Sequence, residues 1–206
     1  MKTISKIFLS MLLACVGTVA AHADSPLTSS DFAHCYNDID MVAEAIANPG
    51  EVNPTVMNYL ADKNVPVDER VAVVNAIGWN FNGLTTGDQF GTYLMKRYKA
   101  KNMKSLAKKL DAGTLVVCAY AKAMSNYFNV DEAVELAEMA VKKDRTNSFT
   151  IRYIAALIKA QKLMDSDWGA LYRVVENVYN DGSLRVDMRQ CAIDAIWDYI
   201  KLYAEY

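Results

Sequence analysis

His34 offers the widest choice of chemistry, because it is the only histidine beyond the first 23 residues and a cysteine follows it. Cys35, with Asp38 and Asp40 close behind, could supply sulfur and oxygen donors to a metal ion. A single histidine excludes a two-histidine metal site and leaves Cys-His or Ser-His catalysis dependent on one residue. A solvent-facing helix explains these residues more simply, and we predict no metal site.

Ser105 and Lys108 have the S-x-x-K spacing of penicillin-binding enzymes, in which the lysine helps to deprotonate the serine. The companion S-D-N and K-T-G motifs of those enzymes are missing from the chain. Gly83 and Gly87 flank a turn but lack the lysine and the spacing of a phosphate-binding loop. We therefore predict no catalytic residue and no cofactor.

The stretch from Asp165 to Glu176 faintly imitates a calcium-binding loop. Ala170 occupies the place where the sharp turn of such a loop requires glycine, and the residues after it have a helical pattern. Helix capping by Asp165 or Ser166 is the better explanation of these polar residues.

Seven basic residues and no acidic residue lie between Met95 and Lys109. A solvated helix face is the usual origin of such a stretch. The functional alternative is a contact for an anionic lipid, a polysaccharide or an acidic protein.

Residues 1–23 have the features of a secretory signal peptide. Two lysines precede an apolar run from Ile7 to Ala20, and Ala21-His22-Ala23 forms a small-x-small cleavage site. The run is too short to span a bilayer. Leu12-Leu13-Ala14-Cys15 is a rival processing site that resembles the lipobox of bacterial lipoproteins, and lipid attachment at Cys15 remains the alternative.

Cleavage after Ala23 leaves residues 24–206, a length that fits one domain with a sizeable core. Loss of the two lysines takes the net charge from −2 to −4, which argues against general nucleic-acid binding. Cys35, Cys118 and Cys191 are too few for a disulfide framework. We expect buried free thiols, with a single bridge as the alternative.

Residues that typically begin or end helices recur along the chain, whereas patterns typical of β-strands are almost missing. Asn53, Asn102 and Asn147 are expected to cap the helices that follow them, and Gly113 is expected to end a helix. Apolar periodicity predicts helices at 29–47, 54–63, 67–80, 86–100, 103–111, 114–128, 130–144, 148–163, 167–180 and 184–203. Short connections between them predict antiparallel neighbours.

A spacing of apolar and small residues recurs in the second half of the chain. Val117, Tyr120, Ala121 and Met124 are followed 34 residues later by Ile151, Ile154, Ala155 and Ile158, and again 37 residues later from Met188 to Ala195. Ala121, Ala155 and Ala192 stand where two helices must approach closely. The residues from 129 to 147 form the second helix of the first unit, with alanines at 133, 137 and 140.

This pattern resembles the tetratricopeptide repeat, and the resemblance covers roughly residues 114–206. Arg145 stands where that family usually has proline, and the second copy needs about three inserted residues. The resemblance implies an all-α fold of stacked antiparallel hairpins, with a tetratricopeptide-like superhelix in the C-terminal half. Residues 24–112 are expected to form irregular helical hairpins, and an irregular helical bundle throughout is the alternative.

The resemblance also implies a concave groove lined by the first helix of each pair. In this register the groove residues are Cys118, Lys122, Asn126, Arg152, Lys159 and Arg189. Except for Cys118 we predict that all of them bind a partner. Because four of the six are basic, the expected partner is a protein or peptide with an acidic or C-terminal carboxylate tail.

The sequence therefore predicts a non-enzymatic interaction or scaffold protein, exported to the periplasm or cell surface of a bacterium. Two alternatives stay open. One is a carbohydrate-binding accessory protein of the cell envelope, and the other is a small hydrolase with an unrecognised pair of acidic residues.

Cleavage after Ala23 is directly testable. Mass spectrometry of the exported protein should find an N-terminus at Asp24, because the apolar run meets the small-x-small site there. A diacylglyceryl group on Cys15 would contradict this prediction.

Overall fold

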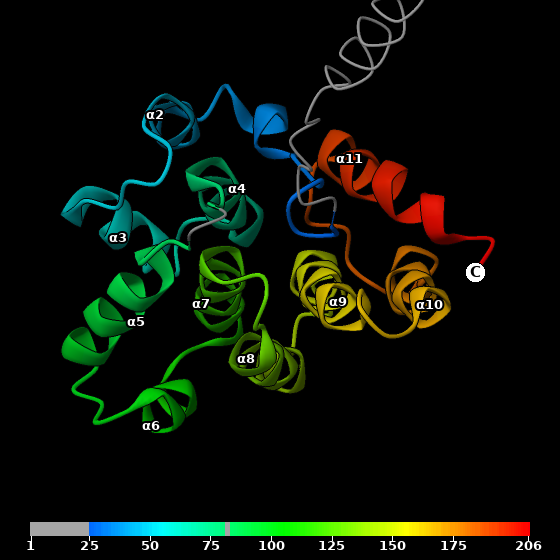
Figure 1. Cartoon of the computed structure of the whole chain (residues 1–206). Helices are drawn as coiled ribbons and strands as arrows, with labels where there is room; N and C mark the ends of the chain where they lie inside the picture. The colour runs from blue at the N-terminus through cyan, green and yellow to red at the C-terminus, as the bar shows by residue number, and fades with distance from the viewer. Residues whose placement is uncertain (1–24, 81–82) are drawn as a thin grey trace, which may run out of the picture.

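The computed structural model describes residues 25–80 and 83–206, so the predicted signal peptide and Cys15 lie outside the described residues. The described residues form ten α-helices and two short 3-10 helices, with no named strand (Figure 1). The α-helices are α2 (Asp40–Ala47), α3 (Pro54–Leu60), α4 (Val67–Ile77), α5 (Thr86–Arg97), α6 (Met103–Lys109), α7 (Ala112–Ser125), α8 (Asp131–Lys143), α9 (Phe149–Leu163), α10 (Trp168–Tyr179) and α11 (Gln190–Ile200). The predicted all-α class is confirmed.

Local capping chemistry starts several helices. Asn53 accepts a hydrogen bond from the Val56 amide at 3.0 Å, as predicted. Asn102 forms the predicted cap of α6 together with Ser105. The prediction for Asn147 was wrong, because Ser148 caps α9 and Asn147 adopts a positive φ of 51° just before it.

Two further sequence-based boundaries differ from the structure. Gly113 does not end a helix but lies in the first turn of α7, whose cap is Asp111. Asp167, rather than Asp165 or Ser166, caps α10 by accepting from the Ala170 amide at 2.7 Å.

The predicted helix 29–47 is divided into a 3-10 helix (Ala33–Tyr36) and α2. The cause lies on α4, where Asn75 makes four hydrogen bonds. Its Oδ1 accepts from the Phe32 and Ala33 amides at 2.9 and 2.8 Å, and its Nδ2 donates to the Ser30 carbonyl and to the Tyr120 hydroxyl, both at 3.0 Å. These bonds hold residues 30–33 in a conformation that does not continue as an α-helix.

Helix α7 is the centre of the fold. Its residues from Thr114 to Ala121 are all buried, and it packs against α4, α5, α8 and α9 (Figure 1). From α7 onward, successive helices are packed neighbours, and α10 contacts both α9 and α11. The same hydrophobic core extends from Leu27 to Tyr203.

The alanines expected at helix crossings have different environments. Ala121 is buried where α5 approaches α7, and Ala192 is buried within α11. Ala155 is only half-buried. At the Ala121 crossing, a Cβ added to Gly87 would lie 2.7 Å from the Ala121 carbonyl oxygen, so the close approach requires glycine on α5.

Two cysteines predicted to be free thiols form a disulfide. Cys35, in the 3-10 helix, is bonded to Cys191, in the first turn of α11, across 156 residues of sequence. Only Cys118 is a buried free thiol among the described residues. Among the same residues, no helix combines the length and the apolar character that crossing a bilayer needs.

The close approach of α5 and α7 predicts opposite effects for two substitutions in one helix. Gly87→Ala should lower the free energy of unfolding by about 1–3 kcal/mol, because the methyl group collides with backbone. Gly91→Ala should instead raise it by about 0.5–1 kcal/mol, since its Cβ would meet only the Met103 sulfur at an ordinary 3.5 Å. Urea unfolding of both variants checks this, and equal shifts would contradict the packing.

Candidate functional site

The structure separates the five residues predicted to bind a partner. Lys122, in the last turn of α7, and Asn126, directly after that helix, line the same groove. Arg152 and Lys159 on α9, and Arg189 before α11, lie outside it. The structure thus brings two of the five together.

The residues outside the groove have different surroundings. Lys159 forms an ion pair with Glu138 on α8 at 3.1 Å. Arg152 has a buried Nε without a hydrogen bond, and its charge contributes to the lowered pKa of Asp144. Burial alone would raise that pKa, but hydrogen bonds from Thr146 and Ser148, together with Arg152, outweigh it. Cys118, also expected on the concave face, is fully buried, and that expectation was wrong.

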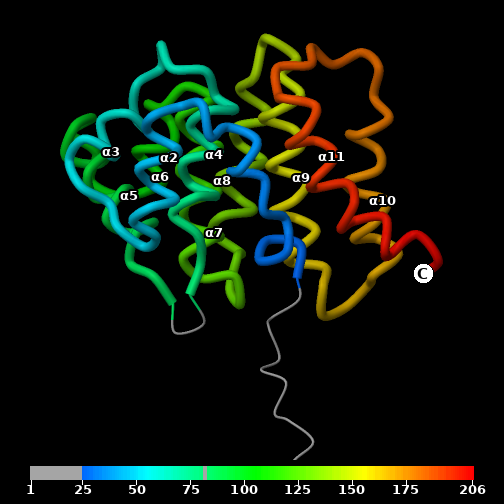
Figure 2. Tube along the Cα trace, turned by 90° about the horizontal axis from the view of Figure 1, so that it is seen from above, coloured from blue at the N-terminus to red at the C-terminus, as the bar shows by residue number. Residues whose placement is uncertain are grey.

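The groove that contains Lys122 lies where α7 ends, between the first turns of α5 and α8. We call it the α5–α7–α8 groove. Its volume is about 520 Å³, and it is lined by Asn80, Gly83, Leu84, Thr85, Asp88, Lys122, Ser125, Asn126, Tyr127, Phe128, Asn129, Glu132 and Ala133. Figure 2 shows the segments after α4, α7 and α9 at this same end of the molecule.

Three charges form one ionic cluster in the groove. The Lys122 ammonium lies 3.0 Å from Asp88 on α5 and 2.9 Å from Glu132 on α8. Each charge also interacts favourably with a helix dipole, because the two acids lie in the first turns of their helices and the lysine lies in the last turn of its helix. Burial lowers the pKa of Lys122, but the two carboxylates outweigh that effect and raise it. With two acids around one base, the cluster is net negative.

Ser125 fixes the floor of the groove. Its Oγ donates to the Ala121 carbonyl at 2.9 Å and accepts from the Gly87 amide at 2.7 Å, with the Thr86 hydroxyl 2.8 Å away. The Ser125 carbonyl accepts from the Leu84 amide at 3.0 Å. These bonds tie the start of α5 to the end of α7, so the groove has a rigid base.

Tyr127 and Phe128 line one wall of the groove, and Trp79 packs against Tyr127 from outside the lining. Trp79 meets Tyr127 edge-on with ring centroids 5.4 Å apart, and Tyr127 meets Phe128 at 4.3 Å. Tyr127 is buried, whereas Phe128 is 67% exposed. The buried ring thus supports a neighbour that presents an apolar face to solvent.

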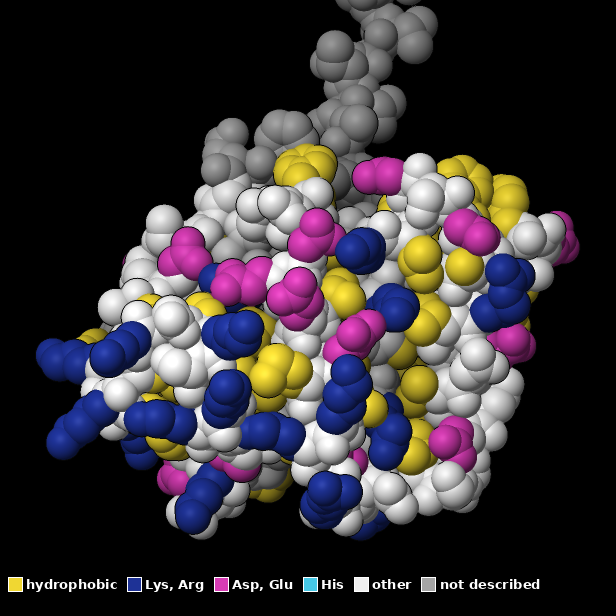
Figure 3. All heavy atoms as spheres, turned by 90° about the horizontal axis from the view of Figure 1, so that it is seen from below, with side chains coloured by type: hydrophobic (Ala, Val, Ile, Leu, Met, Phe, Trp, Pro, Cys, Tyr) yellow, Lys and Arg dark blue, Asp and Glu magenta, His cyan; other side chains and the backbone are white. Residues whose placement is uncertain are grey.

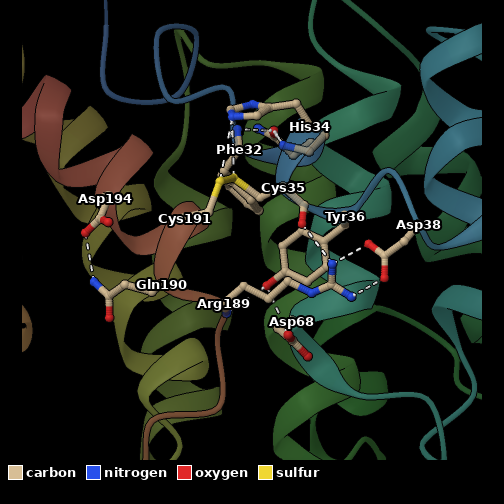
Figure 4. Close-up of a disulfide and its surroundings, with 12 residues drawn as sticks. Phe32, His34, Cys35, Tyr36, Asp38, Asp68, Arg189, Gln190, Cys191 and Asp194 are labelled. Atoms are coloured by element: carbon tan, nitrogen blue, oxygen red, sulfur yellow. Dashed lines mark hydrogen bonds and ion pairs between the residues drawn. A yellow bond between two sulfur atoms is a disulfide. The ribbon is translucent and has the colours of Figure 1, made fainter.

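Arg189 belongs to a different structure, the clamp beside the disulfide (Figure 4). Its guanidinium donates to both carboxylate oxygens of Asp38 and to the Cys35 carbonyl, and it lies 4.4 Å from the centre of the Tyr36 ring. Tyr36 in turn accepts from the Arg189 amide at 3.2 Å and donates to Asp68 at 3.0 Å. Arg189 therefore joins α11 to the N-terminal segment.

The same region holds the one group of three possible metal ligands among the described residues. His34 Nε2 lies 3.4 Å from the Cys35 sulfur and 3.9 Å from the Cys191 sulfur. Because the two sulfurs are bonded to each other in the disulfide, only the imidazole nitrogen of this group remains to bind a metal ion. The Asp38 carboxylate is not free to join His34, because it forms an ion pair with Arg189.

Two other candidate nucleophiles have structural roles. Ser105 Oγ accepts from the Lys101 and Asn102 amides and donates to the Asn102 carbonyl, so it completes the cap of α6. Burial raises the pKa of the Cys118 thiol to about 12, which keeps it protonated at neutral pH.

The seven basic residues between Met95 and Lys109 are all exposed, and none forms an ion pair in the part of the chain that the structure describes. Lys109 donates to the Tyr98 and Lys99 carbonyls, so one of the seven stabilises the turn between α5 and α6. Figure 3 shows Lys and Arg side chains gathered on one side of the view from below.

No protein-family model, curated protein sequence or solved structure matches the chain. A functional proposal therefore rests on the residues and their geometry.

The clamp predicts a structural role for Arg189. Arg189→Gln should lower the melting temperature, because it removes the contacts to Asp38, Cys35 and Tyr36 together. Arg173→Gln is the matched control, since Arg173 is 60% exposed and its pair with Asp167 spans 3.9 Å. Scanning calorimetry under non-reducing conditions separates the two, and an Arg189→Gln protein as stable as the control would disprove the clamp.

Proposed function

We propose that the protein is a binding module that holds a segment of a protein or peptide partner in the α5–α7–α8 groove. The observation that carries the proposal is the combination of a rigid groove of about 520 Å³, an exposed aromatic ring at Phe128 and a net negative charge cluster. Apolar contact supplies affinity in such sites, and a few fixed polar groups supply specificity.

The charges favour a partner segment with a lysine or arginine side chain. Lys122 is already neutralised by Asp88 and Glu132, so a carboxylate tail entering here would meet two like charges. Both carboxylates keep solvent-facing oxygens, since their side chains are 80% and 51% exposed. We therefore favour a basic partner segment over the acidic tail expected from the repeat register.

Export of the protein to the bacterial periplasm or cell surface belongs to the same proposal. The signal-like residues 1–23 support it, as does the Cys35–Cys191 disulfide, because disulfides persist in oxidising compartments and are rare in the cytosol. Packing of α7 to α11 as successive neighbours is compatible with a tetratricopeptide-like scaffold.

Carbohydrate binding is a second candidate, which the polar lining favours. Asn126 and Asn129 flank the exposed Phe128 ring, and sugar rings stack on aromatic faces while amides bind hydroxyl groups. The hydrolase alternative receives less support from the groove, because the acids Asp88 and Glu132 are exposed instead of buried.

Site-specific photo-crosslinking in the producing cell tests the proposal. A photoreactive residue at Asn126 should capture a partner, and the crosslinked segment should contain lysine or arginine. Asn177, exposed on α10, provides the control position outside the groove. Asp88→Asn combined with Glu132→Gln should reduce capture at Asn126 at least about fivefold, because the attracting charge is lost.

Two results would count against a basic partner. Equal capture at Asn126 and Asn177 would remove the groove as the site. Binding of neutral oligosaccharides that needs Phe128 but survives the Asp88→Asn and Glu132→Gln changes would instead establish the carbohydrate alternative.

A further inference from the structure

A second cavity lies at the opposite end of α7, where that helix begins. We call it the N-terminal cavity; its volume is about 490 Å³. Its lining comes from the residues before and within the first turns of α4, α7 and α9, together with residues that precede α11. Figure 2 shows the segments that lead into α4 and α9 at this end, away from the α5–α7–α8 groove.

Three long helices thus begin at the same cavity. Helices α4, α7 and α9 contain 11, 14 and 15 residues. The amides of a first helical turn lack partners within the helix, and the helix dipole places partial positive charge there. This geometry favours negative charge in the cavity.

Arg70 is the independent observation that points to a ligand. The residue lines the cavity but is only 3% exposed, and in the described part of the chain no carboxylate lies within ion-pair distance of it. Nη1 donates to the Thr114 hydroxyl at 3.2 Å and weakly to the Leu60 carbonyl at 3.5 Å. Its Nε is buried without a hydrogen-bond partner. A buried cation without an anion is costly.

Nη2 of the Arg70 guanidinium lies against Gly113, which lines the cavity. A Cβ added to Gly113 would lie 2.6 Å from Nη2 of Arg70, so glycine makes room for this arginine. Neither Nη2 nor Nε makes a hydrogen bond to the described residues. An arginine Nη without a hydrogen bond can donate to an oxygen of a carboxylate or phosphate.

The carboxylates around the cavity are engaged elsewhere. Asp111 accepts from the Thr114 amide and hydroxyl, both at 2.8 Å, and Asp187 accepts from the Thr150 amide at 2.9 Å while it pairs with Arg185. Asp68 and Asp144 also line the cavity. The Asp68 carboxylate accepts a hydrogen bond from the Tyr36 hydroxyl, and the Asp144 carboxylate accepts one from the Ser148 amide. Burial lowers the pKa of Arg70, and Asp111 and Asp62 offset this only in part.

Four more basic residues line the cavity. Lys143 donates to the Ala107, Lys108 and Leu110 carbonyls, and Arg185 pairs with Asp187. Lys63 and Arg145 are exposed and form no ion pair within the described ranges. They add positive charge where a ligand would enter, and Arg70 provides the buried anchor.

We propose that the N-terminal cavity binds an oxyanion group, a carboxylate or a phosphate, on Nη2 of Arg70, with Lys63 and Arg145 at the entrance. The proposal does not depend on the α5–α7–α8 groove, which lies at the other end of α7.

Titration calorimetry on the full exported chain in a buffer free of both anions tests this. The probes are inorganic phosphate and an N-acetylated tripeptide with a free C-terminus, which distinguish a free phosphate from a peptide carboxylate. At least one probe should bind and raise the melting temperature. Arg70→Met should weaken that binding at least about tenfold, because it removes the buried donor. Lys104→Met, an exposed residue on α6 outside both cavities, should leave it unchanged.

Two variants cover the possibility that Arg70→Met fails to fold. Lys63→Glu with Arg145→Glu changes only exposed residues and should weaken binding, whereas Gly113→Ala should weaken it by displacing Nη2 while the charge remains. The proposal is overturned if neither probe binds the unaltered chain, or if Arg70→Met, folded, binds as tightly as the unaltered chain.

Discussion

The structure depends on the burial of α7 on all sides. A helix with continuous burial from Thr114 to Ala121 must be surrounded, and α4, α5, α8 and α9 surround it. Close packing against α7 then limits the size of the side chains on the neighbouring helices. At Gly87 on α5, for example, even a Cβ would collide with the backbone of α7. Because the sides of α7 are covered, only its ends reach solvent-filled spaces. Both cavities argued to bind ligands lie at those ends.

The charged side chains at the two ends of α7 are paired differently. At the C-terminal end of α7, Lys122 is enclosed by the first-turn acids of α5 and α8, and the groove is net negative. At the N-terminal end, the acids cap helix amides and Arg70 remains without an anion. The chain is closed around α7 by Asn75 and by the Cys35–Cys191 disulfide, which join distant segments. Neither closure involves residues of the α5–α7–α8 groove.

Most helix positions were predictable from neighbouring residues, although the caps predicted at Asn147 and at Asp165 or Ser166 were wrong. Features set by distant residues were not predictable. Helix positions and the caps at Asn53 and Asn102 follow from local pattern, and the structure has them. The break before α2 depends on Asn75, more than 40 residues away. The spacing of Lys122 and Asn126 placed them on one helix face, but no local signal showed that Asp88 neutralises Lys122 across 34 residues. The ion-pair partner of a charged side chain can be far away in the sequence. For that reason the sequence predicted an acidic partner, whereas the structure favours a basic one.

The most direct measurement is chemical-shift mapping of the labelled full chain with two short peptides of opposite charge, one rich in lysine and one rich in glutamate, each with one aromatic residue. The proposed groove predicts salt-sensitive shifts at Asn126, Phe128 and Glu132 with the lysine peptide. The glutamate peptide should leave these three amides unchanged. Shifts of these amides with the glutamate peptide alone, or with neither peptide, would contradict a groove that recognises basic segments.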